Sequence, residues 1–451
     1  MRTHHNPLSV GINSPIDFDM AATRGKKRAL YGSIDKAVSD FYNRHPYPPP
    51  VRNLDRYQKR WQVQSRQRAD FHLYWPLESF HERGSILVAG CGTSQAAKYA
   101  LRYPETRIVG IDNSETSIQH SQDLRKKYGL ENLELLVLPI ERASELGEGF
   151  DQIICTGVLH HLPDPEIGLN ILRRVLSPNG AMHLMVYAPY GRTGIYMLQN
   201  FCHRIGVLPN SREIEDLAQT LQFLPNDHPL HQRLRDSLDF QSEAGLADAL
   251  LHPQDRAYSV PQVLEFIQRC GLTFGRWLRQ APYLPQCNPI AKSPYASRIS
   301  QLPHFQQYAI MELFRGTMAR HSLIVYRDDQ PTHKFALRFD KDGWQEYIPI
   351  RMPSTISIQE RLPVGAAAVL INQAHTFTDL YLPIDQLEKQ WFDAIDGQRS
   401  TAEILKESNS NSELELQSKA RDFFEQLWHY DQVVFNASKR GASDSSIKCV
   451  L

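Results

Sequence analysis

The chain of 451 residues contains little cysteine, and what it has is scattered. The six cysteines form no CxxC pair, which argues against a structural zinc site or a disulfide framework and favours a reducing compartment. Long apolar runs are also missing, since none approaches the roughly 20 residues that a membrane-spanning helix needs. Charge of one sign does not prevail, because 50 Lys and Arg balance 50 Asp and Glu. We therefore expect a cytoplasmic protein without a metal site, a membrane segment or a general attraction to nucleic acid.

The length predicts two domains. Residues 1–30 are polar and basic without periodicity and show no apolar stretch typical of a secretion signal, so we expect a flexible leader. Residues 31–328 form the predicted main domain, and the sequence Asp-Asp-Gln-Pro that ends at Pro331 marks its boundary. Residues 332–436 form the second domain, and residues 437–451 a flexible tail.

Apolar runs alternate with amphipathic stretches between Ser85 and Arg192. The runs are Ile86–Ala89, Arg107–Ile111, Leu133–Leu138, Gln152–Cys155 and Ala181–Tyr187. Strands that are apolar almost throughout are buried on both faces. The alternation therefore predicts an α/β domain with a parallel sheet covered by helices.

The first apolar run leads into the sequence Gly90-Cys91-Gly92. Two glycines one residue apart let the backbone turn sharply and approach a ligand with no Cβ in the way. The next run ends at Asp112, where a carboxylate is placed to accept hydrogen bonds from a ribose. A dinucleotide site is disfavoured, because Gln95 stands where the GxGxxG motif has its third glycine.

Two later segments add to this pattern: Phe150–Leu162 is a strand that runs into a loop, and Leu176–Gly180 includes a turn before the next strand. Together with the two glycines and the distant acid, they resemble the motifs of class I S-adenosylmethionine-dependent methyltransferases. The resemblance covers roughly residues 85–187. It implies a Rossmann-like sheet of seven strands whose last two are antiparallel, for which Thr273–Trp277 and Ser322–Tyr326 are candidates.

The resemblance also implies S-adenosylmethionine as cofactor and a set of residues that would bind it. These are Ala89, Gly90, Cys91, Gly92, Asp112, Asn113, Ile140, Glu141, Val158 and Leu159. The glycine loop would lie along the methionine and ribose, Asp112 would hold the ribose hydroxyls, and Ile140 and Glu141 would flank the adenine. Two positions depart from the family pattern, because Val88 replaces a frequent acid and Ser94 a frequent third glycine.

Methyl transfer is an in-line displacement that rests largely on positioning. An oxygen or nitrogen acceptor also needs a group that takes its proton, and His160 or His161 is the candidate general base. The alternative is that this histidine pair only packs against its surroundings.

Aromatic residues around the predicted sheet are candidates for an acceptor pocket. We expect Tyr42, Tyr47, Tyr187, Tyr190 and Arg192 to contact the acceptor. Arg279–Tyr283 follows the sixth strand and would contribute as well. The helical segment 31–84 and the helical insertions at about 194–320 are expected to form a lid, although ordinary core packing explains the aromatics equally well.

The second domain reads as a small α+β, winged-helix-like module with three helices and a β element. Between Pro383 and Phe435 it has five Lys or Arg against eleven Asp or Glu, so repulsion from phosphates makes nucleic-acid binding improbable. The stretch Trp391–Leu405 is similar to winged-helix peptide-recognition modules and to regulatory domains of some protein methyltransferases. A stabilising or dimerising appendage is the alternative.

These observations predict an S-adenosylmethionine-dependent methyltransferase that acts on an O, N or C nucleophile of a small metabolite or of a peptide or protein. A catalytically silent cofactor-binding or scaffold protein is the alternative. The oligomeric state stays open.

Overall fold

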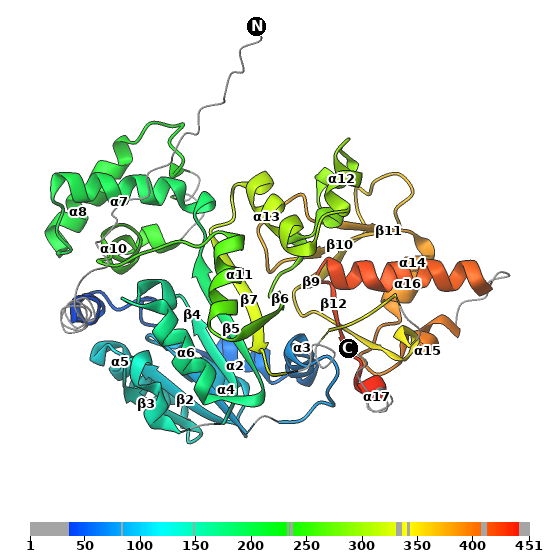
Figure 1. Cartoon of the computed structure of the whole chain (residues 1–451), viewed down its shortest axis with the longest axis horizontal. Coiled ribbons are helices and arrows are strands. Elements are labelled where there is room, and N and C mark those ends of the chain that lie inside the picture. The colour runs from blue at the N-terminus through cyan, green and yellow to red at the C-terminus, as the bar shows by residue number, and fades with distance from the viewer. Residues whose placement is uncertain are drawn as a thin grey trace, which may run out of the picture.

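The computed structural model describes residues 36–82, 84–147, 149–231, 234, 238–330, 336–340, 343–406 and 413–441. The predicted leader and most of the predicted tail lie outside these residues. Figure 1 shows a central sheet, a lobe of helices beyond one end of it, and the C-terminal elements beside the edge strand β6 (Leu272–Trp277). None of the described helices has the length and apolar character that crossing a lipid bilayer requires.

The central sheet has seven strands. Besides β6, these are β1 (Ser85–Ala89), β2 (Arg107–Asp112), β3 (Leu133–Val137), β4 (Phe150–Thr156), β5 (Leu176–Tyr187) and β7 (Arg320–Arg327). They lie in the order β3-β2-β1-β4-β5-β7-β6. Neighbours from β3 to β5 are parallel, while β7 runs antiparallel to both β5 and β6. The predicted seven-stranded sheet is confirmed, including the antiparallel pair at its end.

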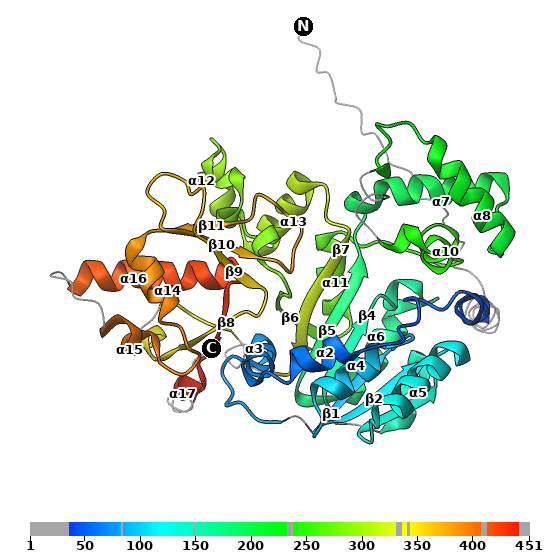
Figure 2. The ribbon, with the colours of Figure 1, turned by 180° about the vertical axis from the view of Figure 1, so that it is seen from behind.

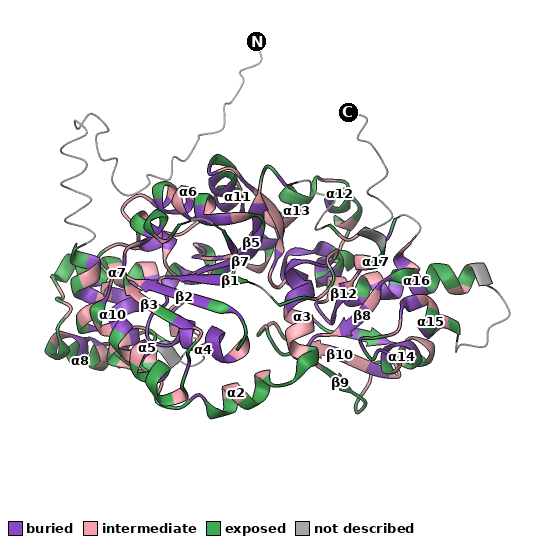
Figure 3. Ribbon diagram, turned by 90° about the horizontal axis from the view of Figure 1, so that it is seen from below, coloured by how far each residue is buried: buried purple, intermediate pink, exposed green. Residues whose placement is uncertain are grey.

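Helices cover both faces of the sheet because successive side chains of each strand point to opposite sides. Leu87 packs into the core beneath one set of helices, and its neighbour Ile86 packs into the core beneath the other set. The first face carries α6 (Pro165–Val175) and α11 (Val260–Arg269), which lie in front in Figure 1. The second carries α4 (Gln95–Arg102) and α5 (Glu115–Tyr128), seen in Figure 2. The inner strands β1, β2, β4 and β7 are accordingly buried along most of their length, as Figure 3 shows, while the edge strands β3 and β6 are less buried.

Local sequence explains where these helices begin and end. The Asp164 carboxylate accepts hydrogen bonds from the backbone N–H groups of Glu166 and Ile167, and Pro165 takes the first helical position of α6. Helix α5 ends at Gly129, whose left-handed backbone (φ +60°) satisfies the last carbonyls.

The N-terminal and inserted segments are helical, as predicted. A helix at residues 36–44 is followed by α2 (Asp55–Trp61) and α3 (Gln64–Tyr74). The insertions contribute α7 (Thr193–Ile205), α8 (Ser211–Thr220), α10 (Glu243–Leu251), α12 (Ala296–Ser300) and α13 (His304–Arg315). The phenol of Tyr42 donates a hydrogen bond of 2.9 Å to Asp248 on α10, which ties the first helix to the helical lobe.

The C-terminal region contains small antiparallel sheets and helices. Its elements are β8 (Ile348–Arg351), β9 (Thr355–Ile358), β10 (Ala368–Asn372), β11 (Leu382–Ile384), α14 (Gln386–Asp393), α15 (Thr401–Lys406), α16 (Glu413–His429), β12 (Val433–Asn436) and α17 (Ser438–Gly441). Strand β12 pairs with β8, and β10 lies between β9 and β11. The three predicted helices are α14, α15 and α16, and likeness to a winged helix stays a prediction. Helix α17 stands where the sequence predicted the start of a flexible tail.

The alternation of side chains in residues 335–339 predicts a strand at the start of the second domain, but its described part, residues 336–339, forms none. Their apolar side chains serve packing instead, since Phe339 is buried and its ring lies 5.4 Å from that of Phe435.

The C-terminal region docks onto the end of β6 through buried polar contacts. Asp431 forms an ion pair of 2.9 Å with Arg276 of β6 and accepts a hydrogen bond of 3.0 Å from the backbone N–H of Ala281. Nearby, Gln280 donates to the carbonyl of Trp428 at 2.6 Å. Removing one partner of a buried ion pair leaves an uncompensated charge, so this contact fixes the two regions to each other.

Candidate active site

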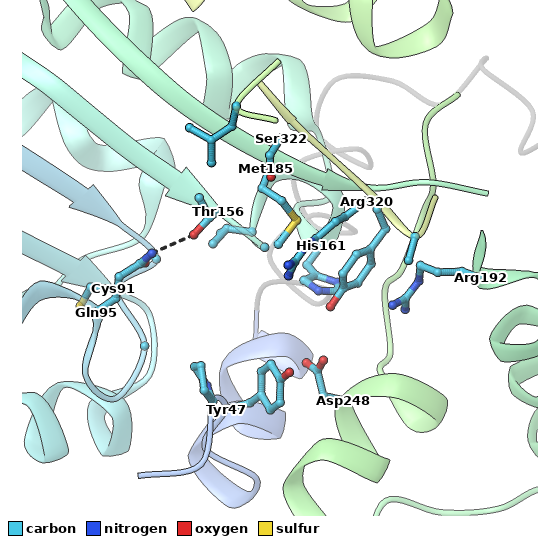
Figure 4. A pocket seen from close by; sticks show the side chains of 18 of the residues that line it. Tyr47, Cys91, Gln95, Thr156, His161, Met185, Arg192, Asp248, Arg320 and Ser322 are labelled. Carbon is cyan, nitrogen blue, oxygen red and sulfur yellow. Dashed lines mark hydrogen bonds between the residues drawn. The ribbon is translucent and has the colours of Figure 1, made fainter. Parts of the chain in front are cut away.

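A cavity of about 1540 Å³ lies at the carboxyl ends of the parallel strands, where open α/β sheets bind ligands. Its wall includes residues from the sheet, the N-terminal segment, the helical lobe and the C-terminal region. In Figure 4, Met185 and His161 lie on the sheet side of the cavity, while Tyr47 and Asp248 face them from the opposite side.

The glycine loop after β1 forms one end of the cavity. The backbone N–H groups of Gly90 and Cys91 both donate to the carbonyl of Ile111 at 2.8 and 2.9 Å, which folds the loop over the tip of β2. Gly90 has φ +68°, and a Cβ there would lie 2.3 Å from Cγ2 of Val158. A side chain at this position would therefore strain the backbone and displace the wall of the cavity.

Asp112 ends β2 and faces the same loop. Its Oδ2 accepts the backbone N–H of Gly92 at 2.8 Å, and its Oδ1 accepts the backbone N–H of Ser114 at 3.0 Å. Burial raises the pKa of Asp112, and backbone hydrogen bonds from Ser114, Gly92 and Asn113 oppose that rise. Each carboxylate oxygen keeps a further lone pair, so the group can still accept hydrogen bonds from a bound hydroxyl.

The remaining residues expected to bind a cofactor divide into two groups. Asn113, Ile140, Glu141 and Val158 line the cavity with the glycine loop and Asp112. Ala89 and Leu159 are fully buried in the core and do not appear on the cavity wall.

The N-terminal segment covers the glycine loop and the tip of β2. Ser39 donates to the carbonyl of Asn113 at 2.9 Å, and the Asn43 side-chain oxygen accepts from the Ser114 hydroxyl at 2.9 Å. Thr93 donates to the carbonyl of Pro48 at 2.8 Å. These contacts hold the segment against the cavity wall, and its role as a lid stays a prediction.

The structure separates the two histidines of the predicted base pair. His160 is fully buried and lies outside the cavity wall, with its ring centroid 4.1 Å from that of Tyr187. Burial, with the nearby histidines and arginines, lowers its pKa well below the ordinary value. His161 lines the cavity, and its Nδ1 lies 2.7 Å from the carbonyl of Gln254. A carbonyl can only accept, so Nδ1 carries the proton and Nε2 keeps its lone pair.

The five residues expected to contact the acceptor all line the cavity. Burial raises the pKa of both Tyr42 and Tyr187, so both phenols stay protonated around neutral pH. The Arg192 guanidinium lies 3.5 Å from the centre of the Tyr187 ring and pairs with Asp255 at 3.2 Å. Arg192 is therefore held as a packed wall element, while Tyr190 is partly exposed at the rim.

Three side chains, those of His161, Asp248 and His252, lie close enough together to be tested as a metal site. One ligand atom each of His161, Asp248 and His252 lie within 4.8 Å of one another. The hydrogen bonds argue otherwise, because Nδ1 of His252 accepts the backbone N–H of Gln254 at 3.1 Å. A neutral imidazole with this pattern carries its proton on Nε2, which leaves no lone pair there for a metal.

Several wall residues were not predicted as site residues. They are Gln95, Lys98, Arg102, Thr156, Met185, Asp248, Arg320, Ser322, His375 and Phe377. Thr156 directly follows one predicted strand, and Met185 lies two residues before the end of another, so position near a strand end was a usable signal for both. Asp248 and His375 lie on distant segments, and nothing in their local sequence marks them. Arg279 and Tyr283, from the segment after β6, line the cavity as the prediction proposed.

The part of the chain that forms this site is similar in sequence to a known protein family. Residues 80–200 match the family described as a methyltransferase domain. This match covers β1 to β5 and thus the loop, the acid and the histidine pair described above. The predicted enzyme class, an S-adenosylmethionine-dependent methyltransferase, is confirmed.

Two relatives extend the comparison in sequence. A protein of Synechococcus sp. whose function is uncharacterised is 27% identical over 336 residues, which cover 72% of this chain and 78% of that protein. The (S)-coclaurine N-methyltransferase of Thalictrum flavum is 23% identical over 115 residues, which cover 25% of this chain and 32% of that enzyme.

A solved structure shares the fold over most of the chain. The protein PKMT2 from Rickettsia typhi superposes with a TM-score of 0.59 at 16% identity, covering 83% of this chain and 75% of that one. The same protein in complex with AdoHcy gives a TM-score of 0.55 at 15% identity. At such identity the likeness concerns the fold.

Proposed function

We propose that this protein transfers the methyl group of S-adenosylmethionine to an O, N or C nucleophile of a small metabolite or of a peptide or protein, with His161 as general base for O–H and N–H acceptors. One observation supports the proposal above all: the Gly90–Gly92 loop, Asp112 and the side chain of His161 line the same cavity.

The residues at the loop end fit an adenosyl cofactor. The backbone at Gly90 leaves a cradle that a Cβ would fill, and the carboxylate of Asp112 faces it with lone pairs to spare. Ile140 and Glu141 continue this wall beyond β3, where an adenine ring would lie. When bound, the cofactor supplies an electrophilic methyl group on a sulfonium.

His161 is placed to take a proton from the acceptor. Its Nδ1–H donates to the carbonyl of Gln254, which fixes the tautomer and the ring orientation. As the acceptor oxygen or nitrogen forms its bond to the methyl carbon, its proton moves to Nε2 and leaves later with solvent. General base catalysis of this kind contributes about 10²- to 10⁴-fold to the rate.

The neighbouring side chains position the acceptor and exclude water. Tyr42 is anchored by its hydrogen bond to Asp248, and the Tyr187 ring is held between His160 and Arg192. These aromatic walls limit how an acceptor approaches the methyl donor, and positioning supplies most of the catalysis in a displacement of this type.

A labelled-methyl assay tests the proposal. The purified chain is incubated with S-adenosylmethionine that carries a radioactive methyl group and with separated small-molecule and protein fractions of a cell extract. We expect label in one fraction and loss of that label in His161→Gln when the acceptor atom is O or N. Cofactor binding without transfer to any fraction would favour the silent cofactor-binding protein instead.

A further inference from the structure

The cavity continues well past the cofactor end, toward the edge strands of the sheet. Arg279, Arg320 and Phe377 line this part, which we call the acceptor arm; Lys98 lines the cavity from α4, which begins three residues after Gly92. Arg320 pairs in register with Tyr187, and the backbone N–H of Leu278 donates to Ser322 at 2.8 Å. The two arginines therefore lie on neighbouring strand ends.

The acceptor arm is too distant to serve the cofactor. Strand β7 lies three strand spacings from β1, which amounts to about 14 Å at about 4.8 Å per spacing. The loop Gly90–Gly92 sits at the tip of β1, so Arg320 and Arg279 lie beyond a cofactor held there. What these arginines face is space for the second substrate.

The cations of the acceptor arm form no ion pair with a described carboxylate, although Arg279 is near enough to Asp431 to oppose the rise that burial causes in the pKa of that carboxyl. No described carboxylate lies within ion-pair distance of Arg279 or Arg320, whereas Arg102 pairs with Asp70 at 3.4 Å and Arg192 pairs with Asp255. The Nε atom of Arg279 is buried without a described hydrogen-bond partner. Arg279 is only partly exposed and donates from Nη1 to the carbonyl of Leu278 at 3.0 Å, whereas Arg320 is exposed and keeps more of its hydration. A partly buried cation that makes no ion pair is stabilised by an anion, and this applies above all to Arg279.

The pKa of a neighbouring histidine agrees with the position of Arg279 and Arg320. Burial lowers the pKa of His183, on β5, to about 4, and Arg279, Arg102 and Arg320 lower it further while Asp70 opposes them. The acidic side chains of the cavity wall lie elsewhere, because Asp112 and Glu141 belong to the cofactor end and Asp248 is bound to Tyr42.

Apolar residues also line the arm, and the C-terminal region contributes to its wall. Tyr283 and Leu278 line it from the segment around β6, and Phe377 lines it from the C-terminal region. Arg315 holds that last wall in place, because it pairs with Asp379 at 2.8 Å and lies 4.4 Å from the centre of the Phe377 ring.

From these contacts we infer that the methyl acceptor is an anion, with a carboxylate or phosphate group held by Arg279 and Arg320 and an apolar body against Phe377. This inference rests on the proposed function, whose acceptor class it narrows. It also assigns the C-terminal region a direct part in the acceptor site.

Ligand-observed NMR on the full chain with S-adenosylhomocysteine tests the inference. The probes are matched pairs: benzoate against benzamide, indole-3-acetate against indole-3-acetamide, and phenyl phosphate against phenol. We expect the charged member of at least one pair to bind about tenfold more tightly, as for a charge-assisted hydrogen bond. The carboxylate and phosphate pairs distinguish the two kinds of anion. Anions that bind no better than their neutral partners would overturn the inference.

Variants locate the effect. Arg320→Gln and Arg279→Gln should each weaken anion binding about tenfold, while Arg298→Gln, an exposed arginine on α12, should leave it unchanged. Equal anion binding in the wild type and both cavity variants would also overturn the inference. S-adenosylhomocysteine affinity, measured by calorimetry, should stay the same in all three. If the wild type does not bind S-adenosylhomocysteine, the proposed function is refuted. The comparison of charged and neutral probes can then be repeated without the cofactor and still tests whether the cavity binds anions.

Discussion

The backbone N–H of Gly92 donates a hydrogen bond of 2.8 Å to Oδ2 of Asp112. This bond joins the loop after β1 to the end of β2 and sets the carboxylate beside a backbone bend without side chains. The same carboxylate accepts from Ser114 at the start of α5, so three segments depend on one side chain.

Replacing Asp112 by Asn should weaken S-adenosylmethionine binding by roughly 10- to 100-fold. An amide NH₂ replaces one acceptor oxygen, and a hydrogen bond to a charged group is worth about 1.5–3 kcal/mol. Isothermal titration calorimetry measures the change. Asp123→Asn, on the exposed surface of α5, is the control and should bind like the wild type. Equal affinity in Asp112→Asn would contradict the assigned role.

Replacing Gly90 by Ala should abolish measurable cofactor binding. The new Cβ would meet Val158 at 2.3 Å, and the φ of +68° adds strain. Gly129→Ala is a matched control, because Gly129 has φ +60° but nothing within 4 Å of the added Cβ. Both variants place an alanine at a positive φ and so share the same kind of backbone strain. A difference in cofactor affinity between them therefore measures the effect of the added Cβ on the glycine loop after β1. Comparable affinity in the two would argue against a ligand at this loop.

The two adjacent histidines should respond differently to substitution. His161→Gln should lower kcat about 10²- to 10⁴-fold for an O–H or N–H acceptor with little change in cofactor affinity, because the general base is lost. His160→Gln should mainly lower stability, since that ring is buried in the wall behind Tyr187. The turnover number and the midpoint of unfolding separate the roles: His161→Gln should lower kcat with little change in the midpoint, and His160→Gln should lower the midpoint. The reverse pattern would transfer the role of base to His160.

Buried histidines should make the fold sensitive to acid. Burial lowers the pKa of His72, His183, His375 and His429 to about 4, from an ordinary 6.5. The unfolded chain then binds more protons than the folded chain between these values. Stability is therefore fully present above about pH 6.5 and is lost as the pH falls toward 4.

Urea unfolding at pH 7.5 and pH 5.5 measures this effect, and the midpoint should be lower at pH 5.5. His183→Gln should reduce the difference between the two midpoints, while His203→Gln, at an exposed position, should not. A midpoint that rises on acidification would show that these rings are protonated in the folded chain.

The sheet was predictable because its information is local. The run that ends at Ala89, the glycine loop and Asp112 each combine a buried strand with the residues that immediately follow it. Residues 336–339 show the limit of this reasoning, because alternation alone does not tell a strand from an irregular segment whose apolar residues reach the core.

The cavity was predictable only in part, because much of its wall is assembled from distant segments. Asp248 reaches Tyr42 across 206 residues, a contact set by how α10 packs on the first helix. Phe377 reaches the arm only because the C-terminal region docks on β6. Sequence also could not separate His160 from His161, since the two differ by which side of a short 3₁₀ turn faces the cavity.

Calorimetric titration of the full chain with S-adenosylmethionine tests the central claim most directly. The account predicts saturable binding of one cofactor per chain, lost in Gly90→Ala and retained in Gly129→Ala. A titration without heat of binding for the wild type, confirmed by equilibrium dialysis with labelled cofactor, would contradict it.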